Sequence, residues 1–362
     1  MTWLRSQRQG MDIQSHKGPY HVAFDQDGLA ALNADIQEGV HFIIDSHVAE
    51  LYRSQMQAIL GHPSVLLIEA LEDNKSLEKF PGYVEHLVKN KLRRDHRIIA
   101  IGGGIIQDIT CFLAATLLRG VEWHFYPTTL LAQADSCIGS KSSINCGSTK
   151  NILGTFTPPK HVVISTPFLK TLDERDVRSG VGEMLKVQVI DGPESFDAIA
   201  ADYQRLFTDP AVMKRYIHRS LLVKQRYIEI DEFDRESRNI FNYGHSFGHA
   251  IEAATAFAIP HGIAVTIGMD LANWIAMRLG VGAENHFTRM HPCLRANYQG
   301  FERTPILMDP FLTALSRDKK NVGEGSAVLI LPDKTGRVFK DNYASDGKFA
   351  RLCEEFLTEV RP

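Results

Sequence analysis

Three histidines close together are the residues of this sequence best suited to chemistry. His245 and His249 are four residues apart, and His261 follows a turn at Pro260. On a helix, positions i and i+4 share one face, so His245 and His249 are a possible metal-binding pair. The glutamate of an HExxH motif is absent, and a lone histidine is usually packed or on the surface. Three histidines flanked by glycines indicate a metal site instead.

Glu183 is a candidate for the carboxylate that would complete such a site. It is a single acid in the apolar, small-residue helical segment 179–186, where a solvated carboxylate would break the pattern. A buried partner is therefore expected. Lys186 lies three residues further on the same helical face, so an ordinary Glu–Lys surface pair is the alternative.

A run of three glycines, residues 102–104, follows an apolar strand and precedes a helix. Glycines let the backbone approach a pyrophosphate closely, and a helix N-terminus favours its charge. The pattern is not GxGxxG, because Gln107 occupies the sixth position. A nucleotide site and a tight structural turn both remain possible. Several cations also lie beside turns or motifs, and they would suit an anionic substrate if they converge. They are Arg119, Lys141, Lys150, Lys186, Lys224, Arg238, Lys319 and Lys320.

The elements that would position these residues alternate between strand and helix in the first half of the chain. Strands are expected at 40–44, 64–68, 97–101, 122–126 and 162–165, with helices at 47–60, 77–89 and 108–118. This alternation predicts a parallel α/β sheet. Long helices then dominate, at 176–190, 211–229, 244–258 and 263–279, before a hairpin at 327–340. We expect an α/β domain over 1–175 and a mostly helical domain over 176–362.

The composition is that of an ordinary globular protein. The chain has 362 residues, 44% of them apolar, and a formal net charge of −3. This overall charge does not favour binding to nucleic acid or to an anionic membrane. There is no secretory signal and no membrane-length apolar run, and residues before about 15 have the character of a polar leader. Five cysteines form no CxxC pair. A cytoplasmic protein is expected.

Several motifs occur together in one order, and they resemble the 3-dehydroquinate synthase family over roughly residues 40–335. They are GGGIIQD (102–108), RG (119–120), PTTLLAQADSCIGSK (127–141), KN (150–151), TL (171–172), SGVGEMLK (179–186), RNIFNYGHSFGHAIE (238–252), HG (261–262) and DKK (318–320).

The resemblance implies a Rossmann-like NAD-binding α/β domain, a mostly helical metal- and substrate-binding domain with the active site in the cleft between them, and a homodimer. It implies that Glu183, His245 and His261 bind one divalent metal, zinc or cobalt, with His249 close by as a base or phosphate contact. The implied catalytic residues are Lys141, Lys186, Lys224, Arg238, Asn242 and His249. The implied substrate contacts are Arg119, Asp135, Lys150, Asn151, Lys319 and Lys320. The implied NAD contacts are Asp45, Glu72, Lys75, Gly103, Gly104, Asp108, Thr128, Thr129, Thr171 and Leu172.

The implied reaction converts the sugar phosphate DAHP to 3-dehydroquinate. NAD transiently oxidises a ring carbinol, phosphate is eliminated, the hydride returns, and an intramolecular aldol closes a carbocycle. The chain departs from the usual family pattern at Gln107, Ser140, Thr149 and Ile263. These departures leave open a sister cyclase acting on sedoheptulose 7-phosphate or glucose 6-phosphate. A metal-dependent polyol dehydrogenase and an inactive NAD-binding homologue are further alternatives.

Overall fold

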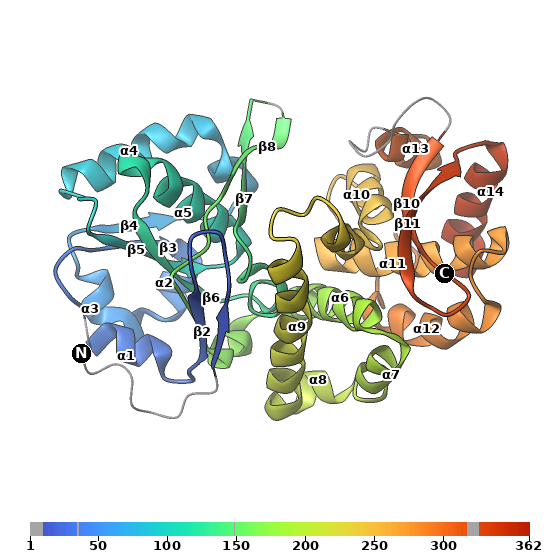
Figure 1. Ribbon diagram of the computed structural model, residues 1–362, viewed down its shortest axis with the longest axis horizontal. Helices are drawn as coiled ribbons and strands as arrows, with labels where there is room; N and C mark the ends of the chain where they lie inside the picture. Colours follow the sequence, from blue (N-terminus) through green and yellow to red (C-terminus); the bar gives the residue numbers. More distant parts are fainter. Residues whose placement is uncertain (1–9, 35, 148, 317–325) are drawn as a thin grey trace. The chain divides into compact units, whose positions relative to one another are not determined.

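Short apolar strands of the first half of the chain form one seven-stranded sheet. The computed structural model describes residues 10–34, 36–147, 149–316 and 326–362. All neighbouring strands are parallel except β1 and β2, which confirms the predicted α/β fold class (Figure 1). The spatial order is β1 (Gly10–Ile13), β2 (Tyr20–Phe24), β9 (His161–Ile164), β6 (Glu122–Pro127), β5 (Arg97–Gly102), β3 (Val40–Asp45) and β4 (Val65–Ile68).

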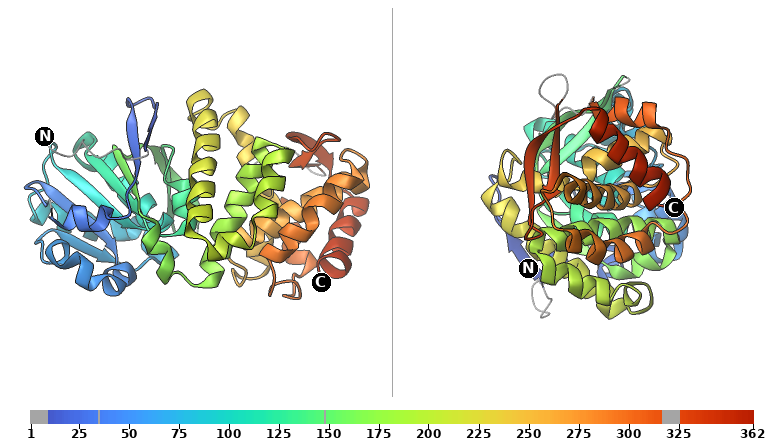
Figure 2. Two further views of the ribbon diagram at one scale, coloured as in Figure 1. Left: turned by 90° about the horizontal axis from the view of Figure 1, so that it is seen from below. Right: turned by 90° about the vertical axis from the view of Figure 1, so that its right-hand side faces the viewer.

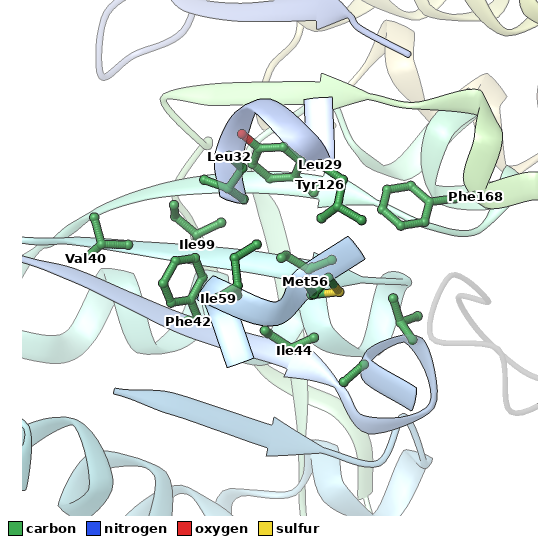
Figure 3. Close-up of a cluster of buried hydrophobic side chains, with 13 residues drawn as sticks. Leu29, Leu32, Val40, Phe42, Ile44, Met56, Ile59, Ile99, Tyr126 and Phe168 are labelled. Carbon is green, nitrogen blue, oxygen red and sulfur yellow. The ribbon is translucent and has the colours of Figure 1, made fainter. Parts of the chain in front are cut away.

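The central strands are buried on both faces, as expected of a parallel sheet covered by helices. Because side chains alternate along a strand, Phe42 and Ile44 of β3 point to one face and Ile43 to the other. Figure 3 shows Phe42 and Ile44 in a cluster with Met56 and Ile59. The helices of this part are α1 (Gly28–Ala34), α2 (Ser46–Leu51), α3 (Gln57–Leu60), α4 (Phe80–Lys89) and α5 (Gly104–Thr116).

The carboxyl ends of the parallel strands gather at one edge of the sheet. From β3 the chain continues to β4 on one side, whereas β5 lies on the other side of β3. Such a reversal of strand order is where open α/β sheets bind ligands. Asp45 ends β3, and the glycine turn follows β5 at this edge.

Two local expectations were wrong, and one element was not predicted. The polar leader includes a strand, because Met11 and Ile13 of β1 are buried where β1 pairs with β2. The helix expected at 47–60 is broken at Tyr52 into α2, a 3-10 turn and α3. The segment after residue 140 forms an unpredicted hairpin of β7 (Lys141–Cys146) and β8 (Thr149–Phe156).

Helices dominate the second half of the chain, as the sequence predicts. The central helix α11 lies beside α6, α10 and α12 (Figure 1, Figure 2). The elements are α6 (Glu174–Asp191), α7 (Pro193–Ala201), α8 (Arg205–Thr208), α9 (Pro210–Ile230), the 3-10 turn η7 (Ser237–Asn242), α10 (His245–Ala254), α11 (His261–Leu279), α12 (Glu284–Asn297), α13 (Met308–Ser316), β10 (Ser326–Pro332), β11 (Val338–Ala344) and α14 (Gly347–Glu355).

The packing divides the chain into two units. The sheet unit comprises residues up to Leu172 and also Lys224–Asp234, the end of α9 and the turn after it; the helical unit comprises the rest. The assignment of domains to 1–175 and 176–362 stays a prediction, and the packing groups Lys224–Asp234 with the sheet. Within the described ranges, no helix combines the length and apolarity needed to cross a bilayer.

Candidate metal and cofactor sites

Glycines bring the backbones of three helices of the helical unit into direct contact. A Cβ on Gly182 of α6 would lie 2.2 Å from the carbonyl oxygen of Gly262 at the start of α11. A Cβ on Gly262 would lie 1.9 Å from the carbonyl oxygen of Ser179. A Cβ on Gly268 of α11 would lie 2.1 Å from the carbonyl oxygen of Gly244, which has a φ of +77° before α10. Only glycine fits these positions, so the backbones of α6, α10 and α11 pack against each other with no side chain between them.

Each of these contacts has a potential metal ligand next to it in sequence. Glu183 follows Gly182, His245 follows Gly244, and His261 precedes Gly262. Their ligand atoms all lie within 4.8 Å of one another. The Oε1 atom of Glu183 lies 3.7 Å from Nε2 of His245 and 3.6 Å from Nε2 of His261. Ligands about 2.1 Å from a tetrahedral metal lie about 3.4 Å apart, so the observed spacing suits a single ion.

Hydrogen bonds at the opposite ring nitrogens orient both histidines. Nδ1 of His245 lies 3.2 Å from the carbonyl oxygen of Tyr243, and Nδ1 of His261 lies 3.2 Å from Oε2 of Glu252. A histidine that binds metal through one nitrogen commonly donates its other N–H to a carbonyl or carboxylate. The residues present therefore fit a divalent metal at the two Nε2 atoms and Glu183.

The electrostatics of the two rings differ. Burial lowers the pKa of His245 well below its usual value, and the nearby charge of Lys186 adds to the effect. Burial also lowers the pKa of His261, but the hydrogen bond with Glu252 and the charge of Glu183 outweigh it, so this pKa is raised. The neutral form of His245 is the one that offers a lone pair to a metal.

Lys186 shares Glu183 with the histidines. Its Nζ donates to Oε2 of Glu183 at 2.5 Å and lies 5.7 Å from the ring centre of Phe241. Both members of the pair are about 2% exposed, which excludes the surface-pair alternative. His249 is exposed, with its ring centre 5.5 Å from that of His245. A second group of possible donors, His249, Glu252 and His261, overlaps the first.

The turn η7 precedes this cluster and contains two further predicted residues. Arg238 is buried, and Asn242 donates its side-chain N–H to the carbonyl oxygen of Asn239 at 3.0 Å. Both lie within seven residues of His245 in sequence. Lys319 and Lys320 lie outside the described residues.

The glycine turn of the sheet unit connects strand β5 with helix α5, an arrangement that can bind a phosphate group. A Cβ on Gly103 would lie 2.9 Å from Cγ2 of Thr129, so the turns after β5 and β6 are closely packed. Thr128 is buried and donates its backbone N–H to the carbonyl oxygen of Gly102 at 3.0 Å. A Cβ on Gly104, at the N-terminus of α5, would meet no atom within 4 Å. This open helix N-terminus can accept a phosphate group.

Three other predicted NAD contacts lie at the end of β3 and after β9. The Asp45 carboxylate accepts the backbone N–H of His47 and caps α2, and burial raises the pKa of this carboxyl. Thr171 bonds with the hydroxyl of Tyr52 at 3.0 Å. Leu172 is half-buried directly after it. These positions share the carboxyl edge of the sheet with the glycine turn.

A buried lysine joins several of the predicted cofactor and substrate residues. Nζ of Lys75 donates to Oδ2 of Asp108 at 3.1 Å and to Oδ1 of Asn151 at 2.9 Å, and lies 3.5 Å from Oε1 of Glu72. Burial raises the pKa of Asp108 although Lys75 opposes the shift. The hairpin β7–β8, which carries Asn151, is thereby tied to α5 and to the turn after β4.

The remaining predicted residues of the sheet unit form two ion pairs or lie exposed. Nζ of Lys224 donates to the carbonyl oxygen of Asp135 at 2.7 Å and lies 2.6 Å from its Oδ1. Lys141 pairs with Asp234. Arg119 and Lys150 are both exposed.

Two partners identified by the structure had no assigned role from the sequence. Glu252 lies seven residues after His245, which places both on one face of α10, and that periodicity could have identified it. Asp234 follows the end of α9, and no sequence pattern connects it with Lys141.

Comparisons with known proteins cover most of the chain. Residues 65–179 match the family model for the 3-dehydroquinate synthase N-terminal region, and residues 180–321 match that for the C-terminal region. A 3-dehydroquinate synthase of Caldanaerobacter subterraneus subsp. tengcongensis is 36% identical over 344 residues, which are 90% of this chain and 94% of the relative.

Solved structures of two cyclases have the same fold. A 2-deoxy-scyllo-inosose synthase, solved with carbaglucose-6-phosphate, NAD+ and Co2+, aligns with a TM-score of 0.84 at 24% identity, over 97% of this chain and 99% of the other. A 2-epi-5-epi-valiolone synthase from Streptomyces hygroscopicus subsp. jinggangensis, solved with NAD+ and Zn2+, aligns with a TM-score of 0.82 at 27% identity, over 94% and 97%.

Proposed function

The chain belongs to the 3-dehydroquinate synthase family, and on that premise we propose that it converts DAHP to 3-dehydroquinate and phosphate, using NAD and one divalent metal. The observation that carries the proposal is the cluster of Glu183, His245 and His261, whose donor atoms suit one metal ion. The open glycine turn supports the NAD assignment. Cyclases of the same fold bind NAD+ with Co2+ or Zn2+.

The cofactors supply the chemistry that side chains lack: NAD accepts and returns a hydride, and the metal polarises the reacting hydroxyl. The reaction is redox-neutral overall, because the hydride returns to the substrate. One C–O bond to phosphate breaks, and one C–C bond forms in the aldol step. The chain's own residues must therefore bind anionic groups, orient the sugar and move protons.

Buried cations suit the binding of these anionic groups. Lys186 and Arg238 in the helical unit, and Lys224 in the sheet unit, are each less than 10% exposed. A cation removed from water interacts more strongly with an anion than an exposed one does. We assign Lys186, Lys224, Arg238 and Asn242 to substrate orientation. His249, exposed beside the metal donors, is assigned as the proton-transfer or phosphate-contacting group.

A sister cyclase is the second candidate. The two cyclase structures of the same fold are 2-deoxy-scyllo-inosose and 2-epi-5-epi-valiolone synthases. The resemblance to the family is imperfect at Ser140, Thr149 and Ile263. Each of these residues lies within two positions of a proposed site residue in sequence, so the substrate could differ from DAHP. The cyclase chemistry is common to both candidates, and only the sugar phosphate differs.

Phosphate release from a panel of sugar phosphates tests the proposal. The purified protein with NAD and Co2+ or Zn2+ is given DAHP, sedoheptulose 7-phosphate or glucose 6-phosphate, with and without a chelator. Chelator-sensitive phosphate release from DAHP, with formation of 3-dehydroquinate, is expected. Release from another sugar phosphate alone supports the sister cyclase. Net NADH formation would indicate a dehydrogenase, and no turnover with any of them would refute a cyclase function.

A further inference from the structure

We propose that Gln107 is a positioning residue that fixes Asp135, and through Asp135 the ammonium of Lys224. The proposal rests on the proposed function, because it assigns Gln107 to the placement of a substrate-binding pair. Gln107 lies on α5, three residues after Gly104.

Two hydrogen bonds connect Gln107 with Ser136. Nε2 of Gln107 donates to the backbone carbonyl oxygen of Ser136 at 2.6 Å, and the Ser136 hydroxyl donates to Oε1 of Gln107 at 2.6 Å. Gln107 is 6% exposed, so water does not compete for these bonds. A side chain held at both ends of its amide has one orientation, and its loss would leave the Ser136 carbonyl and hydroxyl without these partners.

Ser136 ends a short π-helical turn, η5 (Ala132–Ser136), that carries Asp135. Single π-turns interrupt the regular helical hydrogen-bonding ladder and occur frequently at functional sites. Cys137 closes this turn by donating its N–H to the carbonyl oxygen of Ala132 at 2.9 Å. The bonds to Gln107 hold the residue next to Asp135, and therefore restrain the direction of the Asp135 carbonyl and carboxylate.

Asp135 in turn holds Lys224 through both its carboxylate and its carbonyl oxygen, at 2.6 and 2.7 Å. Gln107, Ser136, Asp135 and Lys224 therefore form a continuous series of contacts within the sheet unit. The series begins on the helix that follows the glycine turn and ends at a buried cation. A displacement of Ser136 would move the acceptors of Lys224 without touching the lysine itself.

Steady-state kinetics of Q107A, K224A and the double variant test the proposal. Q107A is expected to raise KM for the sugar phosphate roughly tenfold, with a smaller change in kcat, because an orienting contact and not a reacting group is lost. In the K224A background the same substitution should change KM less than twofold. An equal effect of Q107A in both backgrounds would overturn the proposal.

S136A provides a second variant in case Q107A folds poorly. It removes the hydroxyl donor and leaves the bond from Nε2 of Gln107 to the Ser136 carbonyl oxygen, so a smaller rise in KM is expected. Q188A is the matched control, because Gln188 is also buried and donates to a serine hydroxyl, that of Ser220, at 3.3 Å. Q188A should leave KM unchanged. An unchanged KM in both S136A and Q107A would contradict the proposal.

Urea unfolding of the same variants separates this proposal from the proposed function. Substitutions at distant residues without shared partners usually change stability additively. The contacts given above connect Gln107 with Lys224 through Ser136 and Asp135. Non-additive shifts of the unfolding midpoint for Q107A and K224A are expected even in a preparation without turnover. Additive shifts would refute the positioning role, whereas absent turnover in the unsubstituted protein refutes only the function.

Discussion

The proposed metal donors of the helical unit and the proposed NAD contacts at the carboxyl edge of the sheet unit are positioned in different ways. The metal donors lie beside glycines at which helix backbones touch, so their placement follows from helix packing. The sheet edge consists of turns after strands, and Lys75, Asp108 and Asn151 are held there by side-chain bonds. We infer that the helical site depends on main-chain fit, whereas the sheet edge depends on polar side-chain contacts.

Matched glycine substitutions are the strongest test of this difference. Gly262→Ala would place a Cβ 1.9 Å from the Ser179 carbonyl oxygen, so α6 and α11 must separate. We expect a loss of more than about 3 kcal/mol in the free energy of unfolding, together with loss of bound metal. Urea unfolding and metal analysis measure both effects. A stable, metal-binding Gly262→Ala protein would refute the dependence on backbone fit.

Gly104→Ala is the counterpart at the sheet edge. A Cβ there meets no atom within 4 Å, so the free energy of unfolding should change by less than about 1 kcal/mol. NAD affinity should fall, because the methyl group would occupy the space in which a phosphate approaches the helix N-terminus. Titration with NAD measures this. Unchanged NAD affinity would indicate that the turn is structural only.

Substitution of one metal donor should separate metal binding from folding. His261→Ala leaves Gly262 and the helix contact intact, so we expect the fold to persist while bound metal and activity are lost. Circular dichroism and metal analysis of the purified protein provide the measurement. His218→Ala, which changes a histidine of α9, is the control and should retain metal. Full metal content and activity in His261→Ala would remove this residue from the proposed donor set.

The sequence predicted the buried strands of the sheet better than the contacts between distant helices, for physical reasons. The buried strands at 40–44 and 97–101 appear as apolar runs because both faces of the sheet are covered. The paired histidines His245 and His249 indicated a site, but periodicity within one helix cannot show which residues of other helices approach it. Contact between α6, α10 and α11 depends on glycines far apart in sequence. The hairpin β7–β8 was missed because its polar, largely exposed β8 strand has no apolar pattern.

The amino-terminal edge of the sheet should respond to acid. Burial, followed by the charges of His96, His62 and His86, lowers the pKa of His41 to about 4. Its ring bonds with Ser64 at 2.6 Å and His96 at 2.9 Å. Because the folded-state pKa lies below the unfolded value of 6.5, the unfolded chain takes up a proton first as pH falls. This contribution to stability is complete above pH 6.5 and is lost between pH 6.5 and about 4.

The expected loss from His41 is about 1 to 2 kcal/mol, since one pKa unit corresponds to about 1.4 kcal/mol and solvent screening reduces the effect of the full shift. Urea unfolding at pH values across this window measures it. His41→Gln should show a flatter dependence on pH than the unsubstituted protein, while remaining less stable at neutral pH. An identical pH dependence in the two proteins would show that His41 does not titrate as inferred.

A last substitution tests whether helix packing alone orients the metal donors. Glu252→Gln replaces the carboxylate beside Nδ1 of His261 with an amide, a weaker acceptor for the ring N–H. We expect metal affinity to fall roughly 10- to 100-fold with little change in folding stability. Competition with a chelating dye measures the affinity, and Glu284→Gln on the exposed start of α12 controls for the lost charge. An unchanged affinity in Glu252→Gln would contradict this expectation and would show that the backbone contacts alone orient the His261 ring. A tenfold loss would show that metal donors placed by packed helices also need a side-chain hydrogen bond, which turns the correct ring nitrogen toward the metal. The residues at the sheet edge depend on such side-chain bonds throughout.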